Sequence, residues 1–236
     1  MKIGIVITAK NLINITKAAV ASIQTKHEYH LILIDDFSSD GTYEWMQTVP
    51  NATAYRKFIA SLAGKWNLGA RTAWDSQCEL VLICNNDILF HPVTIDALVA
   101  RMEQGEVGMV TGHSKRDDSR IKEPTDIFKL PEDEEPTEAP HPDFSCFLLS
   151  KETWDIVGEF DEKFIPCYFE DNDYHYRMVQ AGLLAVTTTS APYFHYMSLT
   201  QNSIEGGMCP GERFRRNREY FLNKHGVDPD TYLPVG

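Results

Sequence analysis

Three carboxylates occur within four residues in the second half of the chain: Glu170, Asp171 and Asp173, directly after a proline-interrupted loop. They stand at the start of a short amphipathic helix expected over 170–181. A helix N-terminus favours acidic side chains through its free N–H groups and its macrodipole, but one or two carboxylates are enough for that role. Because carboxylates accept protons and bind cations, the surplus indicates a chemical function. A structural alternative stays open, since Asp173 and Arg177 have the i,i+4 spacing of a helix-surface ion pair.

Acidic and amide side chains also follow two apolar runs, 31–34 and 80–84. They are Asp35 and Asp36 after the first run, and Asn85, Asn86 and Asp87 after the second. Each run is apolar throughout, as expected for a strand that is buried on both faces of a parallel sheet. Open α/β sheets bind ligands at the carboxyl ends of such strands. Two strand ends that carry acids therefore predict a binding site.

Strand-like and helix-like segments alternate along the first half of the chain. We expect strands at 2–8, 30–35, 52–56, 79–84 and 107–111, and helices at 13–26, 41–48, 65–76 and 92–104. A mostly parallel sheet flanked by helices produces this alternation. In the second half we expect strands at 143–149 and 183–188, and helices at 151–157, 170–181 and 210–225.

The segment 114–142 interrupts this alternation. It contains five prolines after Lys122 and an acidic cluster at Glu132–Glu135. Long irregular loops of this kind are usually functional or disordered. The alternative is a solvated surface loop without a role.

Length and composition fit one compact α/β domain, since 236 residues with 43% hydrophobic side chains can bury a large core. The net charge of −12 argues against a nucleic acid or an anionic membrane as the main partner, because both reward clustered Lys and Arg. The N-terminus shows no signal-like pattern, and no run approaches the roughly 20 apolar residues of a transmembrane helix. We therefore expect a soluble, cytoplasmic protein.

The cysteines form no metal-binding motif. Cys78, Cys84, Cys146, Cys167 and Cys209 include no Cys-x-x-Cys pair, which argues against a zinc site. An odd number of scattered cysteines fits reduced thiols in a cytoplasmic protein better than a disulfide framework. Cys78, Cys84 and Cys146 lie in or beside apolar runs, so we expect them in the core.

The order and spacing of these segments resemble the inverting family 2 glycosyltransferases of GT-A fold. The matching segments are IGIVITAKN at 3–11, DDFSSDGT at 35–42, WNLGARTA at 66–73, NND at 85–87, VGEFDEKF at 157–164, FEDNDYHYRMVQAG at 169–182, His195 and NREYFLNKHG at 217–226. The resemblance covers most of the chain and implies a single, Rossmann-like GT-A domain over 1–236. Residues 1–112 would form the nucleotide-sugar-binding half, and residues 113–236 the acceptor-binding half with the catalytic base. The segment 114–142 would then lie on the acceptor side.

The resemblance implies transfer of a hexosyl or deoxyhexosyl group from a nucleoside diphosphate sugar to a hydroxyl of a glycan or other acceptor, with inversion. Uridine diphosphate sugars are the commonest donors of the family, and thymidine diphosphate rhamnose is a rival. Asp171 would be the general base that takes the acceptor proton. Glu170 and Asp173 would position the acceptor or Asp171, and Arg177 would hold Asp173.

The NND triplet stands where the family carries its Asp-x-Asp metal motif. Asp87 would bind Mn²⁺ or Mg²⁺ between the two phosphates, and the late His195 would assist the metal or the diphosphate. Asn85 departs from the Asp that the family often has at this position. Asn85 and Asn86 would offer carbonyl oxygens to the metal or bind the donor ribose. Outside the family frame, a lone histidine such as His195 is more often structural.

Donor contacts are implied at the first two strand ends. Thr8 and Ala9 would line the base of the nucleotide through backbone groups. Asp36, with Asp35 beside it, would accept a hydrogen bond from the imide of uracil or thymine.

Two helices are implied near the diphosphate. Asn67 would open a helix close to it, or is an ordinary helix cap. Arg213 or Arg216 would close over it as part of a lid, or belongs to a solvated basic face.

Two other function classes stay open. A nucleotidyltransferase also combines a doubly wound sheet with acidic metal ligands, but Thr8-Ala9-Lys10-Asn11 lacks the glycine-rich phosphate loop expected after its first strand. A noncatalytic or inactive homologue would keep a pocket for a sugar nucleotide or carbohydrate and would need no base. Asn85 in the metal motif is compatible with such an inactive homologue.

Overall fold

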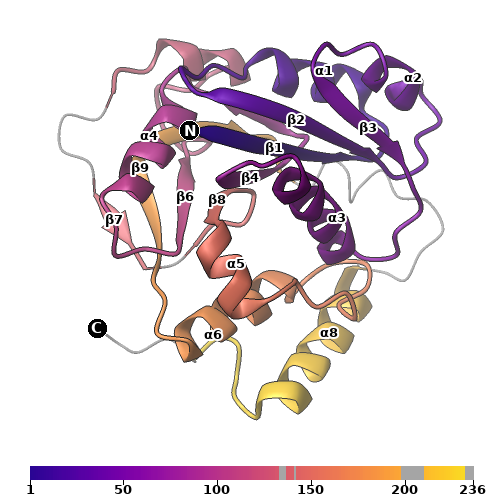
Figure 1. Ribbon diagram of the computed structural model, residues 1–236, viewed down its shortest axis with the longest axis vertical. Helices are drawn as coiled ribbons and strands as arrows, with labels where there is room; N and C mark the ends of the chain where they lie inside the picture. Colours follow the sequence, from indigo (N-terminus) through magenta and orange to yellow (C-terminus); the bar gives the residue numbers. More distant parts are fainter. Residues whose placement is uncertain (133–136, 141, 198–209, 232–236) are drawn as a thin grey trace.

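One mixed sheet runs through the centre of the molecule (Figure 1). The computed structural model describes residues 1–132, 137–140, 142–197 and 210–231. Within these residues the strand order is β3-β2-β1-β4-β8-β6-β9-β5, and β7 pairs with β9. The strands are β1 (Lys2–Ala9), β2 (Glu28–Asp35), β3 (Ala52–Arg56), β4 (Leu80–Asn85), β5 (Ile88–Phe90), β6 (Met109–Ser114), β7 (Glu138–Ala139), β8 (Cys146–Ser150) and β9 (Ala185–His195).

Helices cover both faces of this sheet. They are α1 (Ile13–Ala21), α2 (Thr42–Met46), α3 (Leu62–Asp75), α4 (Thr94–Glu103), the 3-10 helix η1 (Pro124–Lys129), α5 (Lys151–Val157), α6 (Glu170–Gln180) and α8 (Pro210–His225). On one face α1, α2 and α4 contribute Val20, Met46 and Leu98 to the core, and on the other face α3 and α6 contribute Trp66 and Met178. Figure 1 shows α1 and α2 on the opposite side of the sheet from α3 and α5.

Strands β1 to β4 run parallel because a helix crosses over between one strand and the next. β8 lies antiparallel between β4 and β6. β6 and β9 are parallel, whereas β5 and β7 are antiparallel to β9. The expected α/β architecture with a mostly parallel central sheet is therefore confirmed, with antiparallel strands in the second half.

Most expected elements are present within a few residues of their predicted bounds. The helix predicted over 13–26 ends earlier, at Ala21, because the Ser22 hydroxyl bonds back to Ala19 O at 2.7 Å and the chain then leaves the helix. The strand predicted over 183–188 continues to His195. β5, β7 and η1 were not expected, since each is short and carries no clear period of its own.

Some predictions from composition can be compared directly with the described residues. Cys78, Cys84 and Cys146 are buried and free, as predicted. Cys209 and residues 133–135 of the acidic cluster lie outside the described residues. In the described part of the chain, no helix is long and apolar enough to cross a membrane.

The parallel register brings the carboxyl ends of β1, β2 and β4 to the same end of the sheet. Ala9 pairs with Asp35, and Thr8 pairs with Asn85. The N–H of Asp36 then donates to Ala9 O at 2.9 Å, which continues the ladder past the end of β2. The polar residues that follow β1, β2 and β4 therefore lie at a common edge.

Helix α3 packs directly on β1 through two glycines. A Cβ atom at Gly69 would lie 2.2 Å from Val6 Cγ1, and one at Gly4 would lie 2.3 Å from Ala73 Cβ. Both separations are shorter than any van der Waals contact, so only glycine permits this approach. This close packing fixes the position of α3 relative to the carboxyl ends of the strands.

We expect Gly69→Ala to destabilise the fold by about 1–3 kcal/mol through overpacking against Val6, despite the better helix propensity of alanine. Adding Val6→Ala removes the two nearest methyl groups and should recover part of the loss. Urea unfolding measures both changes. Gly211→Ala, whose Cβ meets nothing within 4 Å, is the control and should not lower the midpoint. An unchanged midpoint for Gly69→Ala would contradict the close packing.

Candidate functional site

The first part of the candidate site lies at the end of β2. Asp35 is fully buried and accepts from the N–H of Ser38 at 3.1 and 3.2 Å, with Arg56 Nε at 3.6 Å. Asp36 Oδ2 accepts from Lys65 Nζ at 2.7 Å, and Lys10 Nζ lies 3.6 Å away. Asp36 Oδ1 is buried without a hydrogen-bond partner among the described residues. A ligand N–H can satisfy this oxygen, because buried acceptors are normally paired.

The second part lies between β4 and β9. Asp87 Oδ1 is 3.1 Å from His195 Nε2, and both side chains are mostly buried. The two residues are far apart in sequence but meet because β5 pairs antiparallel with β9, with Ile88 opposite His195. The N–H of Tyr196 also donates to Asp87 O at 2.9 Å.

The Asp87–His195 pair fits part of a divalent metal site. Asp87 Oδ1 and His195 Nε2 lie close enough together that one divalent ion could contact both. The carboxylate of Asp87 suits Mn²⁺ or Mg²⁺, and imidazole is a common ligand of divalent transition metals. Among the described residues, no group of three or more His, Cys, Asp or Glu side chains could hold a metal by itself. The remaining ligands would therefore come from a substrate and from water.

The neighbouring amides are placed differently. Asn86 is buried, and its Nδ2 donates to Thr16 Oγ1 of α1 at 2.9 Å. Asn85 is partly buried and ends β4 level with Thr8, with its N–H bonded to Ser145 O at 3.0 Å.

The third part is the start of α6. Glu170 is buried, and its Oε2 has no hydrogen-bond partner in the described structure. Burial, and then the charge of Asp171, raise the pKa of Glu170 well above its ordinary value. Asp171 is partly buried, and its pKa is also raised, mainly by burial. The N–H of Asn172 opposes this shift through a 2.8 Å hydrogen bond to Asp171 Oδ1.

Asp143, which the sequence analysis did not single out, connects the second and third parts. Its negative charge contributes to the raised pKa of Asp171. Its Oδ2 accepts from Tyr193 Oη at 2.6 Å, and its Oδ1 accepts from Ser145 Oγ at 2.6 Å. Tyr193 precedes His195 by two residues on β9. Asp143 could not be recognised from the sequence because it follows a segment with no regular pattern.

Lys65 connects the first and third parts. Burial raises the pKa of Cys167, three residues before Glu170, to about 12, and the positive charge of Lys65, which also pairs with Asp36, partly offsets this rise. Arg213 of α8 is buried and acts on Cys167 in the same way. Arg213 therefore lies near the loop that precedes Glu170. Arg216 is exposed, and its Nε is 3.3 Å from Asn217 Oδ1.

Asp173 occupies a different position from Asp171. It is fully buried, and its two oxygens accept from Arg177 Nε at 2.9 Å, Lys224 Nζ at 2.5 Å and His225 Nε2 at 2.7 Å. Both carboxylate oxygens are engaged in the contact between α6 and α8. These contacts favour the structural interpretation of Asp173.

Asn67 is likewise engaged within the protein. Its amide accepts from the N–H of Phe160 at 2.9 Å and donates to Phe160 O at 2.9 Å and Glu162 Oε1 at 3.0 Å. Ser61, not Asn67, caps α3, with its hydroxyl accepting from Gly64 N at 3.1 Å. Asn67 therefore joins α3 to the loop before α6, and its contacts give no support to a role at the diphosphate.

Comparison with known families identifies the chain. The model of glycosyl transferase family 2 matches residues 4–157. The chain belongs to this family. The predicted family resemblance is therefore confirmed.

Two relatives of this family 2 chain are similar in sequence. A galactofuranosyl glycosyltransferase of Leishmania donovani is 32% identical over 95 residues, which are 40% of this chain and 21% of that protein. An uncharacterized protein of Sinorhizobium fredii is 23% identical over an alignment of 267 positions, which covers 98% of this chain and 29% of that protein. The chain spans less than a third of the length of either relative.

A solved structure shows the same fold. A mannosyltransferase from Pyrobaculum calidifontis, in complex with GDP-Man and Mn²⁺, superposes with a TM-score of 0.62 at 15% identity, covering 93% of this chain and 69% of that one. The predicted GT-A fold is therefore confirmed. At this level of identity the similarity concerns the fold alone.

The buried Glu170 predicts a pH-dependent stability. Because its pKa is raised above the ordinary 4.5, the folded protein binds a proton that the unfolded chain releases as the pH rises above that value. Stability contributed by this proton is present at low pH and is lost as the pH rises through the raised pKa.

We therefore expect Glu170→Gln, compared with the wild type, to gain stability as the pH rises from about 4.5 to 8. The difference between the urea midpoints of variant and wild type at several pH values measures this. Glu219→Gln, at an exposed position of α8, is the control and should show a constant difference. A constant difference for Glu170→Gln as well would show that Glu170 ionises normally.

Proposed function

We propose that this chain is an inverting glycosyltransferase that moves a sugar from a nucleoside diphosphate sugar to an acceptor hydroxyl. The observation that carries the proposal is the joining of three groups in a family 2 chain: Asp36 at the end of β2, the Asp87–His195 pair, and Asp171 at the start of α6. Asp143 and Lys65 connect these groups through the contacts and charge interactions described above.

The donor nucleotide would bind at the ends of β1 and β2. The unpartnered Asp36 Oδ1 suits a base with a ring N–H, as in uracil, thymine or guanine. A UDP sugar is our first candidate, with a thymidine diphosphate sugar or a GDP sugar as rivals. Thr8 and Ala9, which lie beside this carboxylate at the end of β1, would line the base.

Asp87 and His195 would hold Mn²⁺ or Mg²⁺, with diphosphate oxygens and water completing the coordination. When bound, the ion would act as a Lewis acid for the departing nucleoside diphosphate. Lys10 and Lys65 place positive charge at the end of β2, and Arg213 adds positive charge near the loop before α6, which favours an anionic donor despite the net charge of −12.

Asp171 would accept the proton of the acceptor hydroxyl as its oxygen attacks the anomeric carbon. The bond from that carbon to the diphosphate oxygen breaks from the opposite face, so configuration is inverted. A raised pKa makes Asp171 a stronger base than an ordinary aspartate. The high pKa of Glu170 favours its protonated form, which limits repulsion at the neighbouring base.

The donor site can be tested without knowing the acceptor. We expect one nucleoside diphosphate sugar to raise the melting temperature, with a larger rise when Mn²⁺ is present, because a ligand that binds only the folded state stabilises it. Asp87→Asn should remove the Mn²⁺-dependent part of the rise and keep the rest. Asp117→Asn, at an exposed site, is the control and should behave as wild type. An equal Mn²⁺ effect in Asp87→Asn would exclude Asp87 as a ligand.

The base can be tested with the donor found in this way. Asp171→Asn should lower the rate of nucleoside diphosphate release by about 10²–10⁴-fold, because amides cannot take the acceptor proton. Donor binding, measured by thermal shift, should persist. Asp155→Asn on the exposed side of α5 is the control. A full rate in Asp171→Asn would overturn the assignment, and donor binding without release in the wild type would indicate a noncatalytic homologue.

A further inference from the structure

The loop that leads into α6 has a strained backbone. Tyr168 and Phe169 have φ values of 80° and 69°, in the left-handed region that side chains other than glycine rarely adopt. Two such residues in succession persist only where surrounding contacts hold them. The next two residues are Glu170 and Asp171, so the conformation of this loop decides where the proposed base lies.

One side chain from α8 contacts three carbonyl groups of this loop. Asn217 is buried, and its Nδ2 lies 2.8 Å from Cys167 O, 3.2 Å from Tyr168 O and 3.3 Å from Ile165 O. The loop residues belong to no helix or strand, so contacts with a side chain such as Asn217 take the place of a regular backbone ladder. Since all three neighbours are acceptors, only the NH₂ end of the amide can face them. The other end, Oδ1, faces Arg216 Nε at 3.3 Å.

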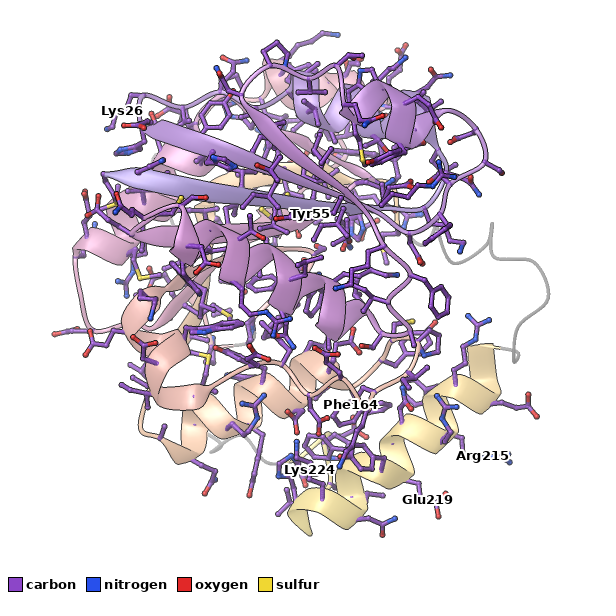
Figure 2. All side chains as sticks on the ribbon, turned by 45° about the vertical axis from the view of Figure 1, so that its right-hand side comes forward. Lys26, Tyr55, Phe164, Arg215, Glu219 and Lys224 are labelled. Carbon is purple, nitrogen blue, oxygen red and sulfur yellow. The ribbon has the colours of Figure 1, made fainter. Side chains whose placement is uncertain are left out.

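Asn217 is held on a firmly anchored part of α8. Lys224 and His225 bond to the buried Asp173 of α6, and Phe221 is fully buried in a cluster with Phe164 and Phe169. Figure 2 shows Lys224 and Phe164 where α8 meets the rest of the protein, and the labelled Arg215 and Glu219 on the outer side of the helix. The anchored helix can therefore impose a fixed geometry on the loop.

We propose that Asn217 is a positioning residue that holds the loop 165–169 in the conformation that directs Asp171 toward the acceptor hydroxyl. It would touch neither donor nor acceptor. The predicted effect of Asn217 on catalysis rests on the proposed function. Its predicted effect on the conformation of the loop can be measured whether or not the protein is active.

The kinetic test compares Asn217→Ala and Asn217→Asp with wild type and with Asn223→Ala, which changes an exposed asparagine on the same helix. Asn217→Asp has nearly the same shape but cannot donate. We expect the kcat for nucleoside diphosphate release to fall by about 10–100-fold in both Asn217 variants, because a displaced base reacts poorly. The KM for the donor should stay unchanged, since the donor would bind at the ends of β1 and β2. If Asn217→Asp does not fold, the kinetic test is decided by Asn217→Ala alone.

Cys167 provides a second readout that needs no substrate. It lies in the loop and is buried, which raises its pKa to about 12 and suppresses its reaction with an aromatic disulfide reagent. We expect Asn217→Ala to speed modification of Cys167 at least about tenfold under native conditions, because only the thiolate reacts and it needs access. The double variant Asn217→Ala/Cys167→Ser should lose the faster modification, which assigns that signal to Cys167. Slow modification of the buried Cys84 and Cys146 shows that the protein remains folded.

The outcomes separate this inference from the proposed function. If the wild type releases no nucleoside diphosphate from any donor, the proposed function fails, and the thiol test still decides whether Asn217 holds the loop. If Asn217→Ala matches Asn223→Ala in both kcat and thiol reactivity, the positioning role is wrong. A raised donor KM with an unchanged kcat would also overturn it, because it would place Asn217 in donor binding.

Discussion

One buried carboxylate, Asp173, joins the helices that surround the proposed base in the second half of the molecule. Its fully buried side chain receives Arg177 from the same helix and Lys224 and His225 from α8. A buried charge must be paired, and removing one partner of such a pair typically costs about 3–5 kcal/mol. Arg177 also donates to Val157 O at 2.7 Å at the end of α5. The ion-pair cluster thus joins α5, α6 and α8, and the position of the neighbouring Asp171 depends on it.

The sequence predicts the strand-end part of the site because that part follows from local pattern. Asp36 and Asp87 each come after a continuous apolar run, and parallel strands with helical crossovers end at a common edge. Asp143, Lys65 and Asn217 carry no such pattern. Their importance arises from contacts with residues distant in sequence, which composition and periodicity do not encode.

The same distinction explains why two residues predicted to belong to the site make contacts within the protein instead. Asn67 and Asp173 match the family pattern in type and spacing, yet each is saturated by hydrogen bonds within the protein. A motif gives the residue type at a position but not the direction of its side chain. For the fold, most segments with a clear period were predicted within a few residues, whereas β5 and β7 form only because β9 lies beside them.

The acidic strand ends also explain how an acidic chain can offer cations to an anionic ligand. Lys65 and Lys10 lie near Asp36, and Arg56 lies near Asp35, so the carboxylates hold the positive groups at the edge of the sheet. An approaching diphosphate would interact with these fixed charges at short range. The net charge of −12 acts mainly through solvent, where it is screened over about 10 Å. Local arrangement therefore outweighs overall charge in selecting such a ligand.

Three carboxyl groups of the site, Glu170, Asp171 and Asp143, interact closely, and their environments separate their roles. Burial without a partner for Oε2 favours the protonated form of Glu170, so its negative charge is reduced beside Asp171. Tyr193 and Ser145 donate hydrogen bonds to the two oxygens of Asp143. The charge of Asp143 then raises the pKa of Asp171 further, in the same direction as burial. Glu170 and Asp171 differ in burial and in the groups that act on them, so they can take different parts in proton transfer. In this arrangement Asp171 is the group that is both partly accessible and made more basic, which is what the proposed displacement requires of its base.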